Sequence, residues 1–171
     1  MVHSKRLVLA VLCCLMILTA ALPARADGEL ELASQTAVLM DADTGVVLYE
    51  KNMHDTMYPA SITKIMTAML AVQHLEPEQV LTVSQTAVNA VPRTSSHISL
   101  QAGERLTVRD ALYAIGMESA NDAANVLAEA VSGSLEAFAE EMTRQAQALG
   151  AMNTHFANAN GLPDSQHFTT A

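Results

Sequence analysis

PASITKIMTAML, Pro59 to Leu70, is the stretch of the sequence that says most about the fold. It predicts a helix, because proline is well suited to the first turn, where its missing N–H has no partner to lose. The helix is expected to run to about His74. Its side chains are apolar almost all the way round, and Ser61 and Lys64 are the exceptions that need an explanation.

The spacing of Ser61 and Lys64 suggests a reason for both residues. Positions i and i+3 share one face of a helix, so the serine hydroxyl and the lysine amine can come within hydrogen-bond reach. Desolvation in apolar surroundings lowers the pKa of a lysine, and a neutral amine can take the serine proton so that the serine forms a covalent ester. Surrounding apolar side chains are expected from Ile62, Ile65, Met66, Met69 and Leu70.

A structural reading of the same pair stays open at this point. Ser61 could simply cap the helix, and Lys64 could extend its amine to water. The lysine content argues for chemistry, because only Lys51 and Lys64 remain once the N-terminal 26 residues are removed.

Ser119-Ala120-Asn121 forms a second candidate group, at the junction of two expected helices. Ser119 could pass a proton between the lysine and a leaving amine. Asn121 could donate to a substrate carbonyl and accept from the lysine. Alternatively, Ser119 caps the second helix, with Asp122 at its third position.

The first 26 residues have the features of a secretory signal peptide. Lys5 and Arg6 precede an apolar run, and Ala24-Arg25-Ala26 is a small-x-small cleavage site. An uncleaved N-terminal anchor is the alternative. Both cysteines lie inside the apolar run, so the mature chain has no disulfide, which favours a bacterial envelope protein, periplasmic or on the outer face of the cytoplasmic membrane, or a secreted one.

The charge of the mature chain excludes several classes of partner. Removal of the signal peptide leaves six basic against 18 acidic residues, a formal charge of −12. This argues against binding to nucleic acid or to anionic lipid. The six histidines are scattered, and His155 and His167 fall in a loop without an evident partner. We expect no metal site and no cofactor.

The remaining elements follow from turn and cap signals. A β-hairpin is expected around the loop 41–45, and the region between about 80 and 105 should contain a short helix near 84–90 and little else that is regular. Helices are expected from Thr107, with a capping box to Asp110, from about 120 to 131, with Gly133 as its end, and from Ser134 to Gly150. The last segment, 151–171, should be a loop with an Asn160-Gly161 turn.

Taken together, these motifs resemble a known superfamily. Penicillin-binding proteins and class A β-lactamases combine Ser-x-x-Lys with a later Ser-Asp-Asn and a Lys-Thr-Gly. The stretches YPASITKIMTA, SANDAA and FANANGLPD resemble more narrowly the serine D-Ala-D-Ala carboxypeptidases of peptidase family S11, the low-molecular-weight penicillin-binding proteins. The resemblance implies an α+β, β-lactamase/transpeptidase-like fold, an antiparallel sheet flanked by helices.

The resemblance also implies roles for the matching residues. Ser61 matches the nucleophile that carries the acyl ester, and its backbone N–H would be an oxyanion donor. Lys64 matches the proton acceptor, Ser119 the serine of the second motif and Asn121 its asparagine. The family removes the terminal D-Ala of peptidoglycan stem peptides and is acylated by β-lactam antibiotics, so both are the expected partners.

Two other functions remain open. A β-lactamase would need a general-base glutamate on a loop after the second motif, and Glu118 precedes that motif. A non-catalytic envelope protein that binds peptidoglycan through the same cleft would need no catalysis at all.

The third family motif does not occur, since no lysine follows Lys64. A two-stranded hairpin is also too small a sheet to be stable alone. We therefore expect residues 27–171 to be the N-terminal part of a larger catalytic domain, cut before its Lys-Thr-Gly strand. The chain alone should then be inactive, and any membrane anchor would have to be C-terminal.

Overall fold

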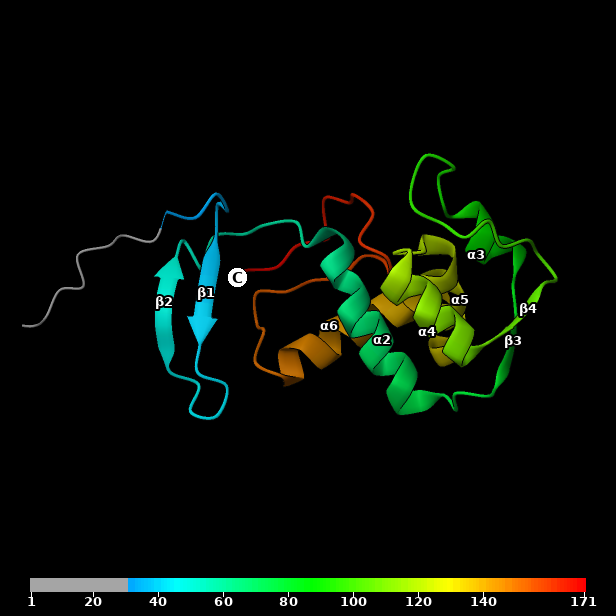
Figure 1. The fold of residues 1–171 in the computed structure, drawn as a ribbon, viewed down its shortest axis with the longest axis horizontal. Coiled ribbons are helices and arrows are strands. Elements are labelled where there is room, and N and C mark those ends of the chain that lie inside the picture. The colour runs from blue at the N-terminus through cyan, green and yellow to red at the C-terminus, as the bar shows by residue number, and fades with distance from the viewer. Residues whose placement is uncertain (1–30) are drawn as a thin grey trace, which may run out of the picture. The chain divides into compact units, whose positions relative to one another are not determined.

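The computed structural model describes residues 31–171 (Figure 1). The predicted signal peptide, residues 1–26, lies outside the described residues. Within residues 31–171, none of the helices combines the length and the apolar character that a membrane span requires.

The predicted hairpin is confirmed as strands β1 (Ala37–Met40) and β2 (Val47–Lys51), which pair antiparallel. In its loop, the Asp41 carboxylate accepts hydrogen bonds from the N–H and the hydroxyl of Thr44. These bonds hold the pKa of Asp41 below its usual value. Apolar side chains on both faces of the hairpin remain exposed: Val38, Leu39, Met40, Val46, Val47 and Leu48.

The helices pack around α5 (Asn121–Ser132), whose first eight residues are all buried. It contacts α2 (Thr63–His74), α4 (Val108–Met117) and α6 (Leu135–Ala148) (Figure 1). Five of its buried residues are alanine or asparagine, whose small side chains allow close approach of neighbouring helices. The largest fully buried apolar side chains around it are Phe138, Leu70, Leu127 and Met142.

Helix ends follow the predicted cap signals. The Ser134 hydroxyl accepts a hydrogen bond from the N–H of Ala137 at the start of α6. Gly133 ends α5 in the left-handed conformation, with φ of 81°, which glycine adopts without a steric penalty. Ser84 likewise caps the short helix α3 (Gln85–Asn89). The predicted caps at Gly133 and Ser134 are confirmed, and the short helix expected near 84–90 is present.

One sheet was missed by the sequence patterns. Strands β3 (Val80–Thr82) and β4 (Arg105–Thr107) pair antiparallel, with Leu81 opposite Leu106. The expectation that the region between about 80 and 105 contains only one short helix was therefore wrong. Strands of three residues are too short to show an alternating pattern, and their partners are far apart in the chain.

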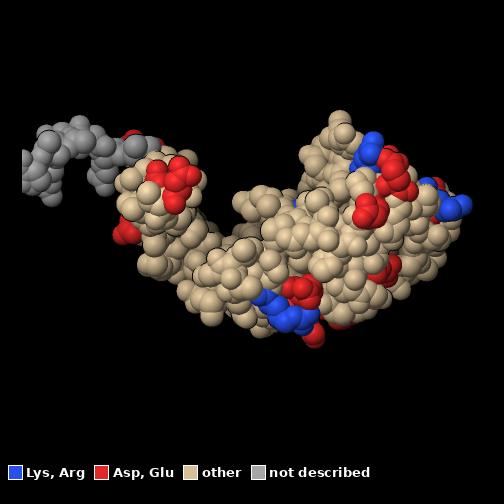
Figure 2. Space-filling view, turned by 90° about the horizontal axis from the view of Figure 1, so that it is seen from below, with Lys and Arg blue, Asp and Glu red and all other residues tan. Residues whose placement is uncertain are grey.

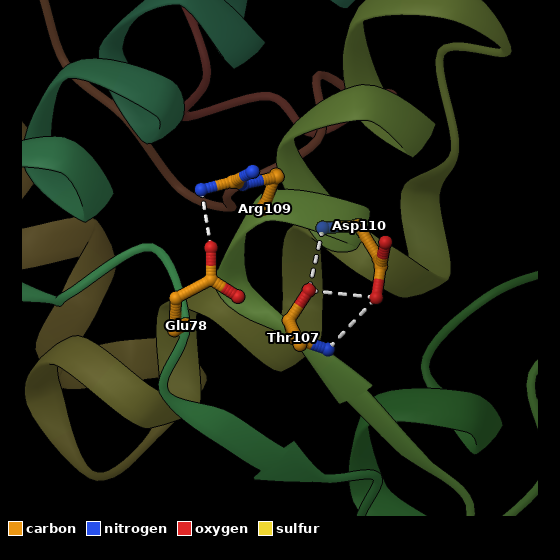
Figure 3. Close-up of polar contacts among 4 residues, drawn as sticks. All are labelled: Glu78, Thr107, Arg109 and Asp110. Carbon is orange, nitrogen blue, oxygen red and sulfur yellow. Dashed lines mark hydrogen bonds and ion pairs between the residues drawn. The ribbon is translucent and has the colours of Figure 1, made fainter.

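The start of α4 combines a capping box with an exposed ion pair (Figure 3). The Thr107 hydroxyl accepts from the N–H of Asp110, and the Asp110 carboxylate accepts from the hydroxyl and the N–H of Thr107. Arg109 forms an ion pair with Glu78, and both side chains are more than half exposed. The predicted capping box is confirmed.

We expect Thr107→Ala to lower the free energy of unfolding by about 1 kcal/mol, because two bonds at the helix start are lost. Arg109→Ala, which removes only an exposed ion pair, should change it by less than about 0.5 kcal/mol. Urea denaturation of both variants measures the difference. Equal losses would contradict the importance of the cap.

Charged side chains lie in small, separate groups on the face drawn in Figure 2, with no continuous basic patch there. Among residues 31–171, the ion pairs Arg109–Glu78 and Arg144–Glu141 bring opposite charges together. The view agrees with the acidic composition, which offers little positive surface to an anionic polymer.

Candidate active site

Ser61 lies in a short 3-10 turn, η1 (Ala60–Ile62), directly before α2. Its neighbour Ala60 has φ of 50°, a left-handed conformation that is strained for a residue with a Cβ. The side chain of Ser61 is exposed and makes no capping hydrogen bond at the start of either helix. The reading of Ser61 as a simple helix cap is therefore wrong.

Lys64 is buried, with 5% of its surface exposed. Its Nζ lies 3.3 Å from the Ser61 Oγ and 2.7 Å from the backbone oxygen of Asn160. Burial lowers the pKa of Lys64 to about 8, because a charged amine is poorly solvated there. About a tenth of the amine is then neutral at pH 7. The structural reading required the Lys64 amine to extend to water, and it does not.

The surroundings of Lys64 differ from those predicted. Ile62 and Ile65 were expected to cover the amine, but they are 69% and 70% exposed. The lysine instead lies on the inner face of α2, which packs against α5. The residues of this buried face are Thr63, Lys64, Thr67, Leu70 and Ala71.

Ser119 lies between α4 and α5, and its Oγ donates a hydrogen bond to the Ser61 Oγ over 3.0 Å. Its φ is 53°, so it too adopts a strained left-handed conformation. The expectation that Ser119 could cap α5 is wrong, because the cap position belongs to Ala120. Asp122 instead accepts from the N–H groups of Ile98 and Leu100.

Asn121 is the first residue of α5 and is 5% exposed. Its N–H donates to the backbone oxygen of Ser96. Within residues 31–171, its carboxamide makes no hydrogen bond to Ser61 or Lys64. Of the four predicted site residues, hydrogen bonds thus join Ser61, Lys64 and Ser119, while the role of Asn121 stays a prediction.

Asn160 is a residue of the site that the sequence patterns did not identify. Its backbone oxygen accepts a hydrogen bond from the Lys64 amine, and its side-chain amide donates one to the buried Asn125 of α5. The only sequence signal was the predicted Asn160-Gly161 turn, which gave no hint that the turn lies against a lysine.

Gly161 approaches the backbone before Ser61 very closely. A Cβ built on Gly161 would lie 1.9 Å from the Ala60 oxygen and 2.3 Å from its carbonyl carbon. Its φ is 84°, a conformation that favours glycine. Only glycine therefore fits between the turn at 158–161 and the turn that carries Ser61.

We expect Gly161→Ala to lower the free energy of unfolding by about 3 kcal/mol, because a backbone clash adds to the left-handed strain. Gly103→Ala is the matched control, since Gly103 has φ of 89° and no atom within 4 Å of the added Cβ. The control should lose only about 1 kcal/mol. Chemical denaturation that gives equal losses would mean that the contact with Ala60 is unimportant.

The C-terminal segment 154–169 holds the inner face of α2 through polar contacts. The Thr67 hydroxyl donates to the Ala159 oxygen over 2.6 Å, and the Thr63 Oγ lies 2.7 Å from the Nε2 of His167. His167 is 2% exposed. From the sequence, His167 was expected to have no evident partner, and that expectation was wrong.

The arrangement is suited to acyl transfer. An exposed serine hydroxyl has an amine of lowered pKa on one side and a second hydroxyl on the other. An activated serine of this kind can attack a carbonyl carbon and form an ester.

Comparison with known proteins supports the same conclusion. A family model described as D-alanyl-D-alanine carboxypeptidase, peptidase family S11, matches residues 22–171. D-alanyl-D-alanine carboxypeptidase DacF of Bacillus subtilis is 39% identical over 98% of this chain and 45% of its own length. DacC of Escherichia coli is 35% identical over 77% of this chain and 36% of its own length.

Solved structures agree. The D-alanyl-D-alanine carboxypeptidase DacD of Francisella tularensis superposes with a TM-score of 0.77 at 36% identity, over 84% of this chain and 35% of its own. Penicillin binding protein 5 of Haemophilus influenzae gives 0.77 at 31% identity, over 84% of this chain and 43% of its own. The predicted penicillin-binding, transpeptidase-like α+β fold is thus confirmed.

The chain spans less than half the length of the curated relatives it matches. The match nevertheless covers nearly all of this chain. It includes Ser61, Lys64 and Ser119, the serine–lysine–serine group. The chain therefore belongs to the D-alanyl-D-alanine carboxypeptidase family of peptidases, S11.

Proposed function

We propose that this chain contributes the nucleophile and the proton acceptor of a serine-type D-Ala-D-Ala carboxypeptidase. The substrate is the D-Ala-D-Ala end of a peptidoglycan stem peptide, and β-lactam antibiotics acylate the same serine. The observation that carries the proposal is the contact of a buried Lys64 amine with the Ser61 hydroxyl, 3.3 Å apart.

In the proposed acylation, the neutral Lys64 amine accepts the Ser61 proton. One N–H of the amine stays bonded to the Asn160 oxygen, so that its lone pair can face the serine. The Ser61 Oγ then bonds to the carbonyl carbon of the penultimate D-Ala. The backbone N–H of Ser61 is an oxyanion donor for the tetrahedral intermediate.

Collapse of that intermediate breaks the peptide bond and releases the terminal D-Ala. Ser119, bonded to the Ser61 Oγ, relays the proton from the lysine to the leaving amine. Asn121 orients the substrate by a hydrogen bond from its carboxamide. Water then hydrolyses the ester, with Lys64 as the base, and restores the free serine.

The location and extent of the protein are part of the same proposal. Residues 1–26 are a signal peptide that exports the chain to the bacterial envelope, where peptidoglycan lies. Residues 27–171 belong to the catalytic domain. The Lys-Thr-Gly motif that the family uses for the substrate carboxylate does not occur in these 171 residues.

The test is to locate the ester. The protein is incubated with a labelled penicillin, denatured and digested with trypsin, which cuts after Lys51 and Lys64. The label should appear on the peptide Asn52–Lys64, which contains Ser61. Release of D-Ala from a stem pentapeptide should accompany it.

The outcomes separate the candidate functions. A long-lived ester with D-Ala release supports the carboxypeptidase, whereas rapid hydrolysis of penicillin without D-Ala release indicates a β-lactamase. Binding of peptidoglycan without any ester would indicate a non-catalytic protein and would overturn the proposal.

A further inference from the structure

The side chain of His167 is buried between α2 and its own segment, far in sequence from the catalytic motifs. Its Nδ1 accepts a hydrogen bond from the N–H of Ala157 over 3.0 Å. A backbone N–H can only donate, so this ring nitrogen must carry a lone pair. The proton of the neutral ring therefore lies on Nε2, which donates to the Thr63 hydroxyl.

We propose that His167 is a positioning residue for Lys64: its neutral ring fastens the segment 154–169 to α2 and so keeps the Asn160 oxygen against the lysine amine. Only the expected effect of this role on the acylation rate of Ser61 rests on the proposed function. Thr63 is adjacent to Lys64 on the buried face of α2. The same segment that holds Thr63 through His167 also holds Lys64 through Asn160.

Both ring nitrogens are used, so the ring fits only in one protonation state. If Nδ1 gains a proton, it can no longer accept from Ala157, and two N–H groups face each other in a buried place. The ring then keeps its bond to Thr63 but loses the bond that ties it to Ala157 of its own segment, so the segment is no longer held to this anchor and Asn160 is free to move away from Lys64. An amine that is less well held and better solvated is a poorer base for Ser61.

Burial of the ring, and not the charges near it, favours the neutral form at ordinary pH. Burial is the main cause that lowers the pKa of His167, with a smaller lowering by His155 and an opposing effect of Asp164. Lys64 is adjacent on α2 to Thr63, the hydrogen-bond partner of His167. Tyr58 and His167 both line a cavity of about 390 Å³. Because the folded pKa lies below the usual value, protonation disturbs the fold only as the pH falls below about 6.5.

Two substitutions separate the two ring contacts. In His167→Gln, the amide nitrogen takes the place of Nε2 and can still donate to Thr63. In His167→Asn, the amide oxygen takes the place of Nδ1 and can accept from Ala157, but nothing reaches Thr63. Thr63→Val removes the same bond from the other side.

The acylation rate of Ser61 tests the bond to Thr63. We expect His167→Asn and Thr63→Val each to acylate about tenfold more slowly than the parent, because a small displacement of the base lowers the rate. His167→Gln should stay within about threefold of the parent. A histidine with a merely structural role would predict equal losses in both amide variants when they are equally stable.

The pH profile gives a readout that simple loss of stability does not produce. Below pH 8 the acylation rate should fall about tenfold per pH unit as Lys64 becomes charged. The slope should approach about a hundredfold per unit below the lowered pKa of His167, where the ring is also protonated. In His167→Gln the slope should stay at about tenfold per unit. A parent whose slope never steepens while circular dichroism shows it folded would overturn the proposal.

A measurement without any acylation keeps the inference independent of the proposed function. The ¹⁵N resonances of the His167 ring should report an Nε2–H tautomer at pH 7, and the pKa of Lys64 should rise in His167→Asn. An Nδ1–H ring, or an unchanged Lys64 pKa, refutes the positioning role even if Ser61 proves inert. Absence of the Ser61 ester with both NMR results as expected refutes only the carboxypeptidase.

Discussion

Ser61→Ala is expected to abolish the labelling of the protein by penicillin and the release of D-Ala. The covalent step needs the Oγ that forms the ester, and among residues 31–171 no other hydroxyl forms a hydrogen bond with the Lys64 amine. Within residues 31–171, the Ser119 hydroxyl forms a hydrogen bond with Ser61 and none with Lys64, so Ser119 cannot directly replace Ser61 as the nucleophile. The measurements are fluorescence of the labelled protein on a denaturing gel and an assay of free D-Ala.

The fold should tolerate this change. The Ser61 side chain is exposed, so the free energy of unfolding should change by less than about 0.5 kcal/mol. Ser95→Ala is the matched control, because Ser95 is a half-buried serine outside the site, with its hydroxyl bonded to the Pro92 oxygen. The control should keep full labelling. Labelled Ser61→Ala protein would show that another residue is the nucleophile.

Lys64→Arg is expected to lower the acylation rate by about a thousandfold, a typical loss when a general base is removed. Guanidinium stays charged at any pH that the protein tolerates, so it cannot accept the serine proton. Arginine keeps the positive charge of the lysine. A loss of rate in this variant is therefore due to the missing base and not to a missing electrostatic attraction. Stopped-flow or quench measurements of acylation give the rate.

Lys51→Arg controls for the exchange itself, since Lys51 lies in β2, outside the serine–lysine–serine group. It should acylate at the parental rate. Because arginine is also larger than the buried lysine that it replaces, Lys64→Met serves as a second, smaller variant without a base. If either Lys64 variant keeps near-parental acylation, the lysine is not the proton acceptor.

The sequence predicted those parts of the fold that depend on neighbours in the chain. The capping box of Thr107 and Asp110 and the helix end at Gly133 are local signals, and both are confirmed. The pairing of β3 with β4 depends on residues far apart in sequence and shows no local pattern. Pattern reasoning missed it for that reason.

The candidate site divides in the same way. The contact of Ser61 with Lys64 follows from helical spacing, although the serine lies in a 3-10 turn before the helix. That Ser119 contacts Ser61 could be expected only from the resemblance to a family, because its left-handed backbone is not visible in the sequence. His167 lies in a long loop, and only tertiary packing gives it a partner.

Burial of the lysine also has a cause that the sequence misassigned. An apolar helix was expected to surround Lys64 with its own side chains, but a helix can cover only its neighbours on one face. The exposed Ile62 and Ile65 lie elsewhere on the helix. What desolvates the amine is the packing of α2 on α5 and on the segment 154–169.

The pKa of Lys64 is the quantity on which the whole account depends, and NMR can measure it directly. The chain has three lysines, Lys5, Lys51 and Lys64, so ¹³Cε-labelled lysine gives few resonances and Lys64→Arg identifies the one of interest. The account predicts that this resonance titrates at about 8. A titration near the ordinary lysine value of about 10.4 would contradict it, because too little neutral amine would then exist to take the proton of Ser61.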